Sequence, residues 1–219
     1  MNKQVAFNEK RLSRASPKGD RFKKDIIEVA LQHFSLYGFE GASIRNIAKD
    51  LGTTHSLIIY HFENKENLWA ATMDATVGEY TDSILTLFAH DQSEPAGPIL
   101  RKFIERFVRL SAKRPEVHRI LTMASTQNSD RIRWLLDAHL KRHFDFVVNL
   151  IRRGQLEGSV RQCDPIRLYY HIIGSAGTTF TLSGEFQALT GRNVFSETEI
   201  YHTIAFIFEI VFQDNVINS

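Results

Sequence analysis

Apolar residues recur every three or four positions along most of this chain, a spacing typical of amphipathic helices. The first such run follows Asp20, a residue that can cap a helix, and it stops at Gly38. Its apolar stripe consists of Ile26, Ile27, Ala30, Leu31 and Phe34. This pattern predicts a first helix over residues 20–38.

Capping residues, prolines and glycines divide the rest of the chain into further helical segments. Ser196 and Glu199 have the spacing of a capping box before the last segment. The predicted helices cover about residues 43–52, 54–62, 64–88, 99–110, 115–126, 129–154 and 164–189, and a last one starts at 196. With no convincing strand or internal repeat, the pattern predicts an all-α fold of about nine helices.

Two polar segments interrupt the helical pattern. Residues 1–19 lack apolar periodicity and end in Ser16-Pro17-Lys18-Gly19, so we expect a flexible arm there. Residues 91–98 (DQSEPAGP) form the clearest break after it. We therefore predict an arm at 1–19, a small helical domain at 20–80 and a second helical domain at 81–219.

Composition narrows the class of protein. Hydrophobic residues make up 43% of the 219 positions, which excludes a disordered chain. The lone Cys163 allows neither an intrachain disulfide nor a four-cysteine zinc site. The longest uncharged stretch, residues 168–184, is too short and polar to span a membrane, and no secretory signal opens the chain. We expect a cytoplasmic protein without membrane contact.

Charge is distributed unevenly although its total is only +2. Residues 1–24 contain eight basic and two acidic side chains, for a net charge of +6, whereas residues 66–219 carry a net charge of −2. A basic end favours a polyanionic partner, and the alternative is a solvated tail.

Residues 43–62 (SIRNIAKDLGTTHSLIIYHF) have the spacing of a helix-turn-helix. Gly52 permits the tight turn between two short helices, and the second helix begins with small polar residues. Such a helix can place its N-terminal side chains in the major groove of DNA. The candidate DNA-binding residues are Ser43, Arg45, Thr53, Thr54, His55, Ser56, Tyr60, His61 and Lys65. The alternative is a plain helical hairpin in a bundle.

Residues 20–80 resemble the DNA-binding domain of TetR-family transcriptional regulators. The residues that carry the resemblance are Ile27, Ala30, Phe34, Gly38, Gly41–Ala48, Leu51, Gly52 and Tyr60–Leu68. One departure is Ile59, which stands where the family usually has a phosphate-binding tyrosine, so Tyr60 or His61 is expected to replace that contact. The resemblance implies a homodimer that binds an operator in double-stranded DNA, with a C-terminal domain that dimerises and binds a small-molecule effector.

The last two helices have the composition of a subunit interface. Residues 201–212 are apolar on more than one side, and residues 174–177 are small. We therefore expect an intersubunit four-helix interface, as the family uses, and the alternative is one large monomeric core. The candidate dimer residues are Gly174, Gly177, Thr181, Ile204, Phe208 and Val211.

The middle helices should hold the effector, in a pocket rich in aromatic side chains because the chain has 16 phenylalanines. The candidate lining residues are Phe103, Phe107, Met123, Trp134, His139, His143, Tyr170 and Phe180. His139 and His143 lie four residues apart, which suits metal binding, polar contacts to a ligand or core packing. With no third ligand indicated, we predict no metal and no cofactor.

Three function classes can be compared on the sequence. We predict a ligand-responsive regulator, more specifically a repressor that an apolar effector releases from a palindromic operator. A non-specific nucleic-acid binder that uses the basic arm is the second hypothesis. An enzyme is the third, and none of the common phosphate-loop, dinucleotide, zinc-protease or nucleophile-elbow motifs is present.

Overall fold

A computed structural model describes residues 17–82, 94–126 and 130–213 of the chain. The predicted all-α fold is confirmed, because the only β pairing among these residues is one isolated antiparallel bridge between Val160 and Phe212. The predicted arm lies outside the described residues except for Pro17–Gly19. No described helix is both long and apolar enough to cross a membrane.

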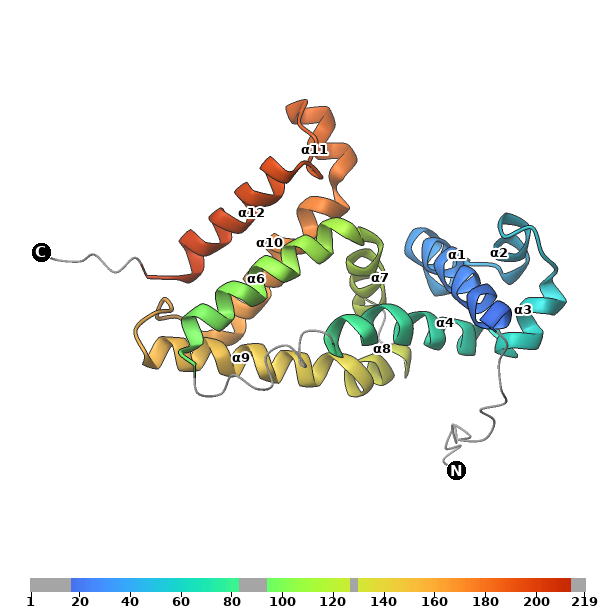
Figure 1. Cartoon of the computed structure of the whole chain (residues 1–219), viewed down its shortest axis with the longest axis horizontal. Helices are drawn as coiled ribbons and strands as arrows, with labels where there is room; N and C mark the ends of the chain where they lie inside the picture. The colour runs from blue at the N-terminus through green and yellow to red at the C-terminus, as the bar shows by residue number, and fades with distance from the viewer. Residues whose placement is uncertain (1–16, 83–93, 127–129, 214–219) are drawn as a thin grey trace, which may run out of the picture.

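Four helices and a π-helical turn form the N-terminal part of the molecule (Figure 1). They are α1 (Pro17–Gly41), α2 (Ile44–Asp50), α3 (His55–Phe62), α4 (Lys65–Met73) and η1 (Asp74–Gly78). The predicted start of the first helix at Asp20 was wrong, since α1 begins at Pro17, and proline is favoured in a first helical turn. Gly38 ends the regular part of α1 as predicted, with φ of 67°.

The remaining helices form a larger bundle around α6 (Figure 1). They are α6 (Ala96–Lys113), α7 (Pro115–Thr126), α8 (Asp130–Leu135), η2 (Leu136–Leu140), α9 (Lys141–Leu156), α10 (Pro165–Thr181), α11 (Ser183–Thr190) and α12 (Glu197–Val211). The single helix predicted for 164–189 is two, because the backbone leaves helical geometry at Leu182, ahead of the weak helix formers Ser183 and Gly184.

Two hydrophobic clusters hold the fold together, and α7 belongs partly to the first. That cluster joins α1–α4 to Ile120 of α7 and Leu135 of α8, both of which are fully or almost fully buried. The second cluster lies among α6, α9, α10 and α12. Helices α7 and α8 therefore complete the N-terminal core, and α7 packs directly on α1. The division between residues 80 and 81 stays a prediction.

Candidate DNA interface and effector pocket

The α2–α3 pair has the geometry of a helix-turn-helix. Gly52, at φ of 67°, makes the turn, and Thr54 caps α3 by accepting a hydrogen bond from Leu57 N at 3.3 Å. Ile58 and Phe62 are buried under α3. Leu57, next to them in the chain, is 38% exposed. The fully buried Ile58 thus fixes which face of α3 looks outward.

The outward face of α3 is polar at its N-terminal end. Thr54, His55 and Ser56 are exposed, Thr53 is half-buried, and Tyr60 is 79% exposed one turn further on. Ile59 is half-buried, so Tyr60 is the aromatic side chain that α3 presents outward. This arrangement places small side chains and free backbone N–H groups where a base edge or a phosphate can approach.

The other predicted DNA contacts flank α3. Arg45 is exposed on α2, whereas Ser43 is half-buried and its side chain forms no capping hydrogen bond to α2. Burial and the nearby charge of Lys23 lower the pKa of His61, so this ring offers a neutral hydrogen bond at pH 7. Lys65 donates to the carbonyl oxygen of Glu40 at 3.1 Å, so its ammonium already has one structural partner.

A buried histidine couples α1 to the helix-turn-helix. His33 is 8% exposed, and its Nε2 lies 2.8 Å from Asp50 Oδ2 at the end of α2. The contact joins positions 17 residues apart. The contact connects α1 to α2, and both helices share a hydrophobic core with α3.

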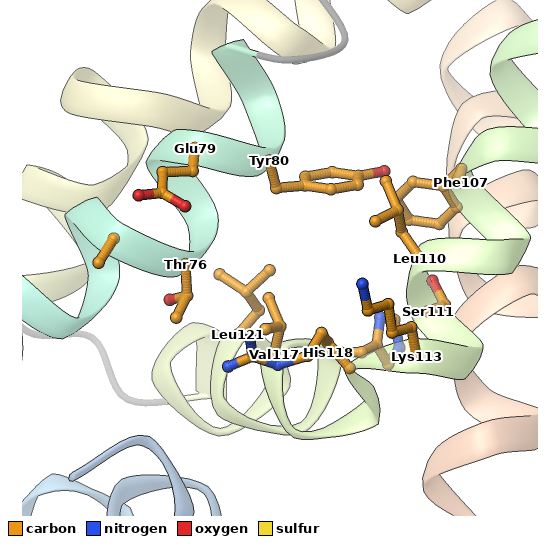
Figure 2. A pocket seen from close by; sticks show the side chains of 12 residues that line it. Thr76, Glu79, Tyr80, Phe107, Leu110, Ser111, Lys113, Val117, His118 and Leu121 are labelled. Carbon is orange, nitrogen blue, oxygen red and sulfur yellow. The ribbon is translucent and has the colours of Figure 1, made fainter. Parts of the chain in front are cut away.

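A cavity of about 250 Å³ opens between η1, α6 and α7 (Figure 2). One part of its wall is apolar and aromatic, and the other carries polar groups. Its lining consists of Ala75, Thr76, Glu79, Tyr80, Phe107, Leu110, Ser111, Lys113, Arg114, Val117, His118 and Leu121. The size is close to the lower end of small-molecule pockets.

Helix α7 forms one wall of this cavity and also contacts the N-terminal core and α10. Val117, His118 and Leu121 line the cavity, whereas Ile120 packs into the N-terminal core. His118 lies so close to Gly177 of α10 that a Cβ added there would come within 2.3 Å of the ring. Burial lowers the pKa of His118, which keeps the ring neutral at pH 7.

Of the eight side chains predicted to bind an effector, only Phe107 lines this cavity. Phe103 and Phe180 are fully buried in the core, and Tyr170 is exposed on α10. Met123 contacts Gly38, and Trp134 packs edge-on against Trp69. None of these five lines the cavity, and their role in effector binding stays a prediction. Leu110, Ser111 and Arg114 follow Phe107 at helical spacing, and this pattern could have predicted these missed lining residues.

The two histidines of the predicted i, i+4 pair do not converge on one site. His139 Nε2 lies 2.8 Å from Asp74 Oδ1, and neither ring lines the cavity. His143 is 3% exposed among aromatic rings of Tyr80, Phe103, Phe107 and Tyr169, and burial lowers its pKa to about 4. Of the three alternatives, the contacts favour packing.

The predicted dimer residues lie on different sides of α10 and α12. Gly177, Ile204 and Val211 are buried within the chain itself, and Thr181 and Phe208 are half-buried. Gly174 has open space beside it. The large hydrophobic side chains that these helices expose are Ile166, Tyr170, Tyr201 and Phe206. The face available to a partner therefore differs from the one that we predicted for Gly177, Ile204 and Val211.

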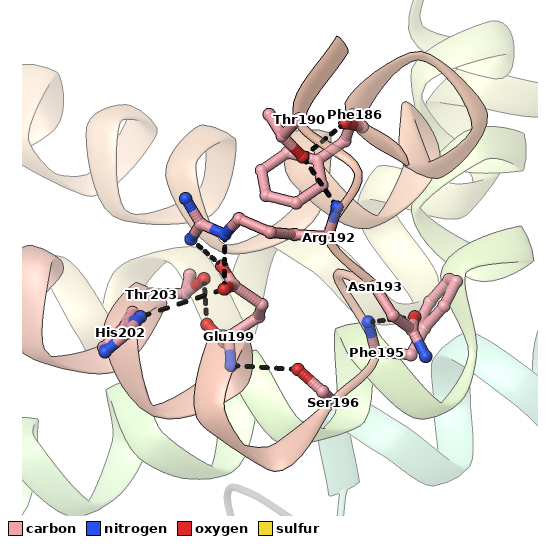
Figure 3. Close-up of polar contacts among 9 residues, drawn as sticks. All are labelled: Phe186, Thr190, Arg192, Asn193, Phe195, Ser196, Glu199, His202 and Thr203. Atoms are coloured by element: carbon pink, nitrogen blue, oxygen red, sulfur yellow. Dashed lines mark hydrogen bonds and ion pairs between the residues drawn. The ribbon is translucent and has the colours of Figure 1, made fainter. Parts of the chain in front are cut away.

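A polar network fixes the turn between α11 and α12 (Figure 3). Arg192 binds both carboxylate oxygens of Glu199, with its Nε donating at 2.7 Å, and this hydrogen bonding lowers the pKa of Glu199. Ser196 caps α12 by accepting from Glu199 N at 3.3 Å, as the capping-box spacing predicted. The Glu199 carboxylate binds Arg192. The backbone N–H of Ser196, which Glu199 would accept from in a complete capping box, donates to the carbonyl oxygen of Asn193 instead. These contacts orient α12 at its N-terminus.

Comparison with known proteins finds one family match in the N-terminal part of the chain and another in the C-terminal part. The family description "Bacterial regulatory proteins, tetR family" matches residues 26–72, and "Tetracyclin repressor-like, C-terminal domain" matches residues 98–211. The regulator RutR of Escherichia coli is 24% identical over 191 residues, which cover 87% of this chain and 89% of RutR.

Two further relatives extend the comparison. The repressor AcnR of Corynebacterium diphtheriae is 26% identical over 151 residues, covering 66% of this chain and 70% of AcnR. The crystal structure of AibR in complex with isovaleryl coenzyme A and operator DNA superposes with a TM-score of 0.68 at 21% identity, covering 85% of this chain and 97% of AibR.

Proposed function

The chain belongs to the TetR family of bacterial transcriptional regulators, which are not enzymes, and from this premise we propose that it is a ligand-responsive repressor. Members of the family bind operator DNA and small-molecule effectors. In our proposal a dimer binds a palindromic operator and a small, largely apolar effector releases it. The repressor mode is supported by AcnR, which is described as a repressor.

The exposed polar start of α3 is the observation that carries this proposal. His55 and Ser56 can reach base edges in the major groove, while Thr54 holds the first turn of α3 in place. Tyr60, exposed one turn later, takes over the phosphate contact that Ile59 cannot make. Basic residues near the N-terminus supply general attraction to phosphates and no sequence discrimination.

Dimerisation follows from the geometry of a palindrome. Two recognition helices must enter major grooves about 34 Å apart, so two copies of α3 are needed. The exposed Tyr170, Tyr201 and Phe206 on α10 and α12 are the apolar surface that we assign to the partner subunit.

The effector is proposed to act through α7. A molecule in the cavity touches Val117, His118 and Leu121, and the opposite side of α7 is part of the N-terminal core through Ile120. A ligand that fits one position of α7 better than another shifts the population of α1 and α3 positions. That AibR was crystallised with a ligand and operator DNA supports this combination of functions in one fold.

The proposal is tested by selecting binding sites from a random pool of duplexes. We expect a palindromic consensus, bound at least about 1,000-fold more tightly than a shuffled duplex at the same salt concentration. Substituting His55→Ala should change the preferred bases without changing affinity for the shuffled duplex. Equal affinity for consensus and shuffled duplexes at matched salt would instead favour the non-specific binder.

A further inference from the structure

An exposed lysine at the C-terminal end of α6 lines the cavity between η1, α6 and α7. Lys113 forms no hydrogen bond or ion pair with any residue that the structure describes, and Figure 2 shows its amino group pointing toward the centre of the cavity. Arg114 follows it in the lining. An ammonium beside an apolar wall is stabilised by an anion, which it can also hydrogen-bond.

The rest of the wall suits an apolar body attached to that anion. Tyr80 and Phe107 provide two aromatic rings 5.6 Å apart, and Leu110, Val117 and Leu121 complete the surface. We infer that the effector is an amphipathic carboxylate whose acidic group binds Lys113 and Arg114 and whose hydrocarbon part lies on these side chains. This inference rests on the proposed function, because it takes the cavity to be the effector site.

The opposite charge sign is less favourable in this cavity. Glu79 is the only acidic residue of the lining, it is exposed, and Figure 2 shows it on the wall opposite Lys113. A cationic ligand near Glu79 would face the ammonium of Lys113 across a small space, whereas the Arg114 charge is already paired with Glu28 and Glu116. His118 adds no charge at neutral pH, because burial lowers its pKa.

Arg114 also provides the link to the DNA-binding end. Its Nη2 donates to both carboxylate oxygens of Glu28 on α1, at 3.0 and 3.2 Å, and its Nε donates to Glu116 at 2.7 Å. Its Nη1 forms no hydrogen bond with the described residues and remains for a ligand. The guanidinium thus lies between the cavity and α1.

A bound carboxylate would be a third anion around this guanidinium. Repulsion among the carboxylates of the ligand, Glu28 and Glu116 then displaces the carboxylate that is least buried. The Glu28 side chain is 56% exposed and the Glu116 side chain only 13%, so Glu28 is the partner that leaves. Loss of the Glu28 contact removes one polar contact between α1 and the corner where α6 meets α7, and in this proposal His33 carries the resulting shift of α1 to α2.

The test compares three ligands of equal length on the purified dimer by calorimetry: octanoate, octanol and octylamine. We expect octanoate to bind at least about tenfold more tightly than the other two, as a charge-assisted hydrogen bond allows. Lys113→Met should remove this preference and leave octanol binding unchanged. Lys102→Met, on the same helix but outside the lining, is the matched control and should bind like wild type.

The other outcomes separate the inference from the proposed function. If octanol binds as tightly as octanoate, or octylamine binds best, the acidic ligand class is wrong while the cavity stays an effector site. If none of the three binds, the inference also fails. Operator release is measured separately: octanoate should weaken operator binding about tenfold in wild type and less than about threefold in Glu28→Gln. Equal weakening in both proteins would overturn the Arg114–Glu28 link.

Discussion

His139 Nε2 lies 2.8 Å from Asp74 Oδ1, and this contact joins the two π-helical turns η1 and η2. The same imidazole ring lies beside Gly78, where a Cβ would come within 2.9 Å of its Cε1. Both turns therefore meet at one histidine, which ties the end of α4 to the segment that leads into α9. π-Helical turns inside α-helices are frequent at functional sites.

The Gly78 contact can be tested by adding one methyl group. Gly78→Ala should lower the free energy of unfolding by about 1–3 kcal/mol, because the ring of His139 must move away from Asp74. Gly184→Ala, on α11 with open space around it, is the control and should stabilise the protein by up to about 1 kcal/mol. Chemical denaturation measures both, and equal effects of the two substitutions would contradict the close contact.

The cap of the recognition helix should affect both folding and DNA binding. Thr54→Ala removes the hydrogen bond to Leu57 N, at a cost of about 1 kcal/mol, and frays the turn that carries His55 and Ser56. We expect weaker operator binding from Thr54→Ala and near wild-type binding from Thr54→Ser, measured by fluorescence anisotropy. If the serine variant binds as weakly as the alanine variant, the threonine methyl matters and the cap does not.

Burial of His143 makes stability depend on pH. Its pKa is lowered to about 4 in the folded chain, against 6.5 for an unperturbed histidine. Between these two pKa values the unfolded chain binds more protons than the folded chain. The contribution of His143 to the free energy of unfolding is therefore fully present above pH 6.5, and it is lost as the pH falls to about 4. The loss amounts to about 3 kcal/mol.

The variant His143→Phe isolates this contribution. In this variant the free energy of unfolding should change less with pH between 6.5 and 4. A smaller pH dependence should remain from His118, because burial also lowers the pKa of His118. Urea denaturation at a series of pH values gives the profile. An unchanged slope in His143→Phe would show that other groups cause the pH dependence.

The subunit interface can be tested with one charge. Phe206 is 57% exposed on α12, so Phe206→Glu should dissociate the dimer by placing an unpaired carboxylate in an apolar contact. Leu189→Glu, at a residue 78% exposed on α11, should leave the dimer intact. Light scattering after size-exclusion chromatography measures the mass. A dimeric Phe206→Glu protein would exclude this face of α12 as the interface.

Local signals in the sequence predicted the helices and the turn chemistry well. Gly38, Thr54, Asn64, Asp164 and Ser196 end or cap helices as their residue types indicate. These effects depend on a few neighbouring atoms and are therefore visible in a short stretch of chain. The break at Leu182 was missed because no proline marks it.

The cavity was predicted poorly because it depends on how distant helices pack. Phe103 and Phe180 were chosen as lining residues because they are aromatic, and both fill the core. Lys113 and Arg114, at the corner between α6 and α7, were not among the candidates. Spacing alone could not show that Ile204 and Val211 face the chain's own interior. Their partners come from α6 and α10, and that pairing is decided by the tertiary fold.

Coupling between the cavity and the DNA-binding end is tested most directly by filling the cavity from α7. Leu121→Trp places a larger side chain in the effector's space, and Leu189→Trp on α11 adds the same side chain at an exposed position. The measurement is the Kd of each folded variant for the selected operator and for a shuffled duplex at one salt concentration. We predict about tenfold weaker operator binding for Leu121→Trp alone, with unchanged affinity for the shuffled duplex. An operator Kd equal to that of wild type would contradict transmission through α7.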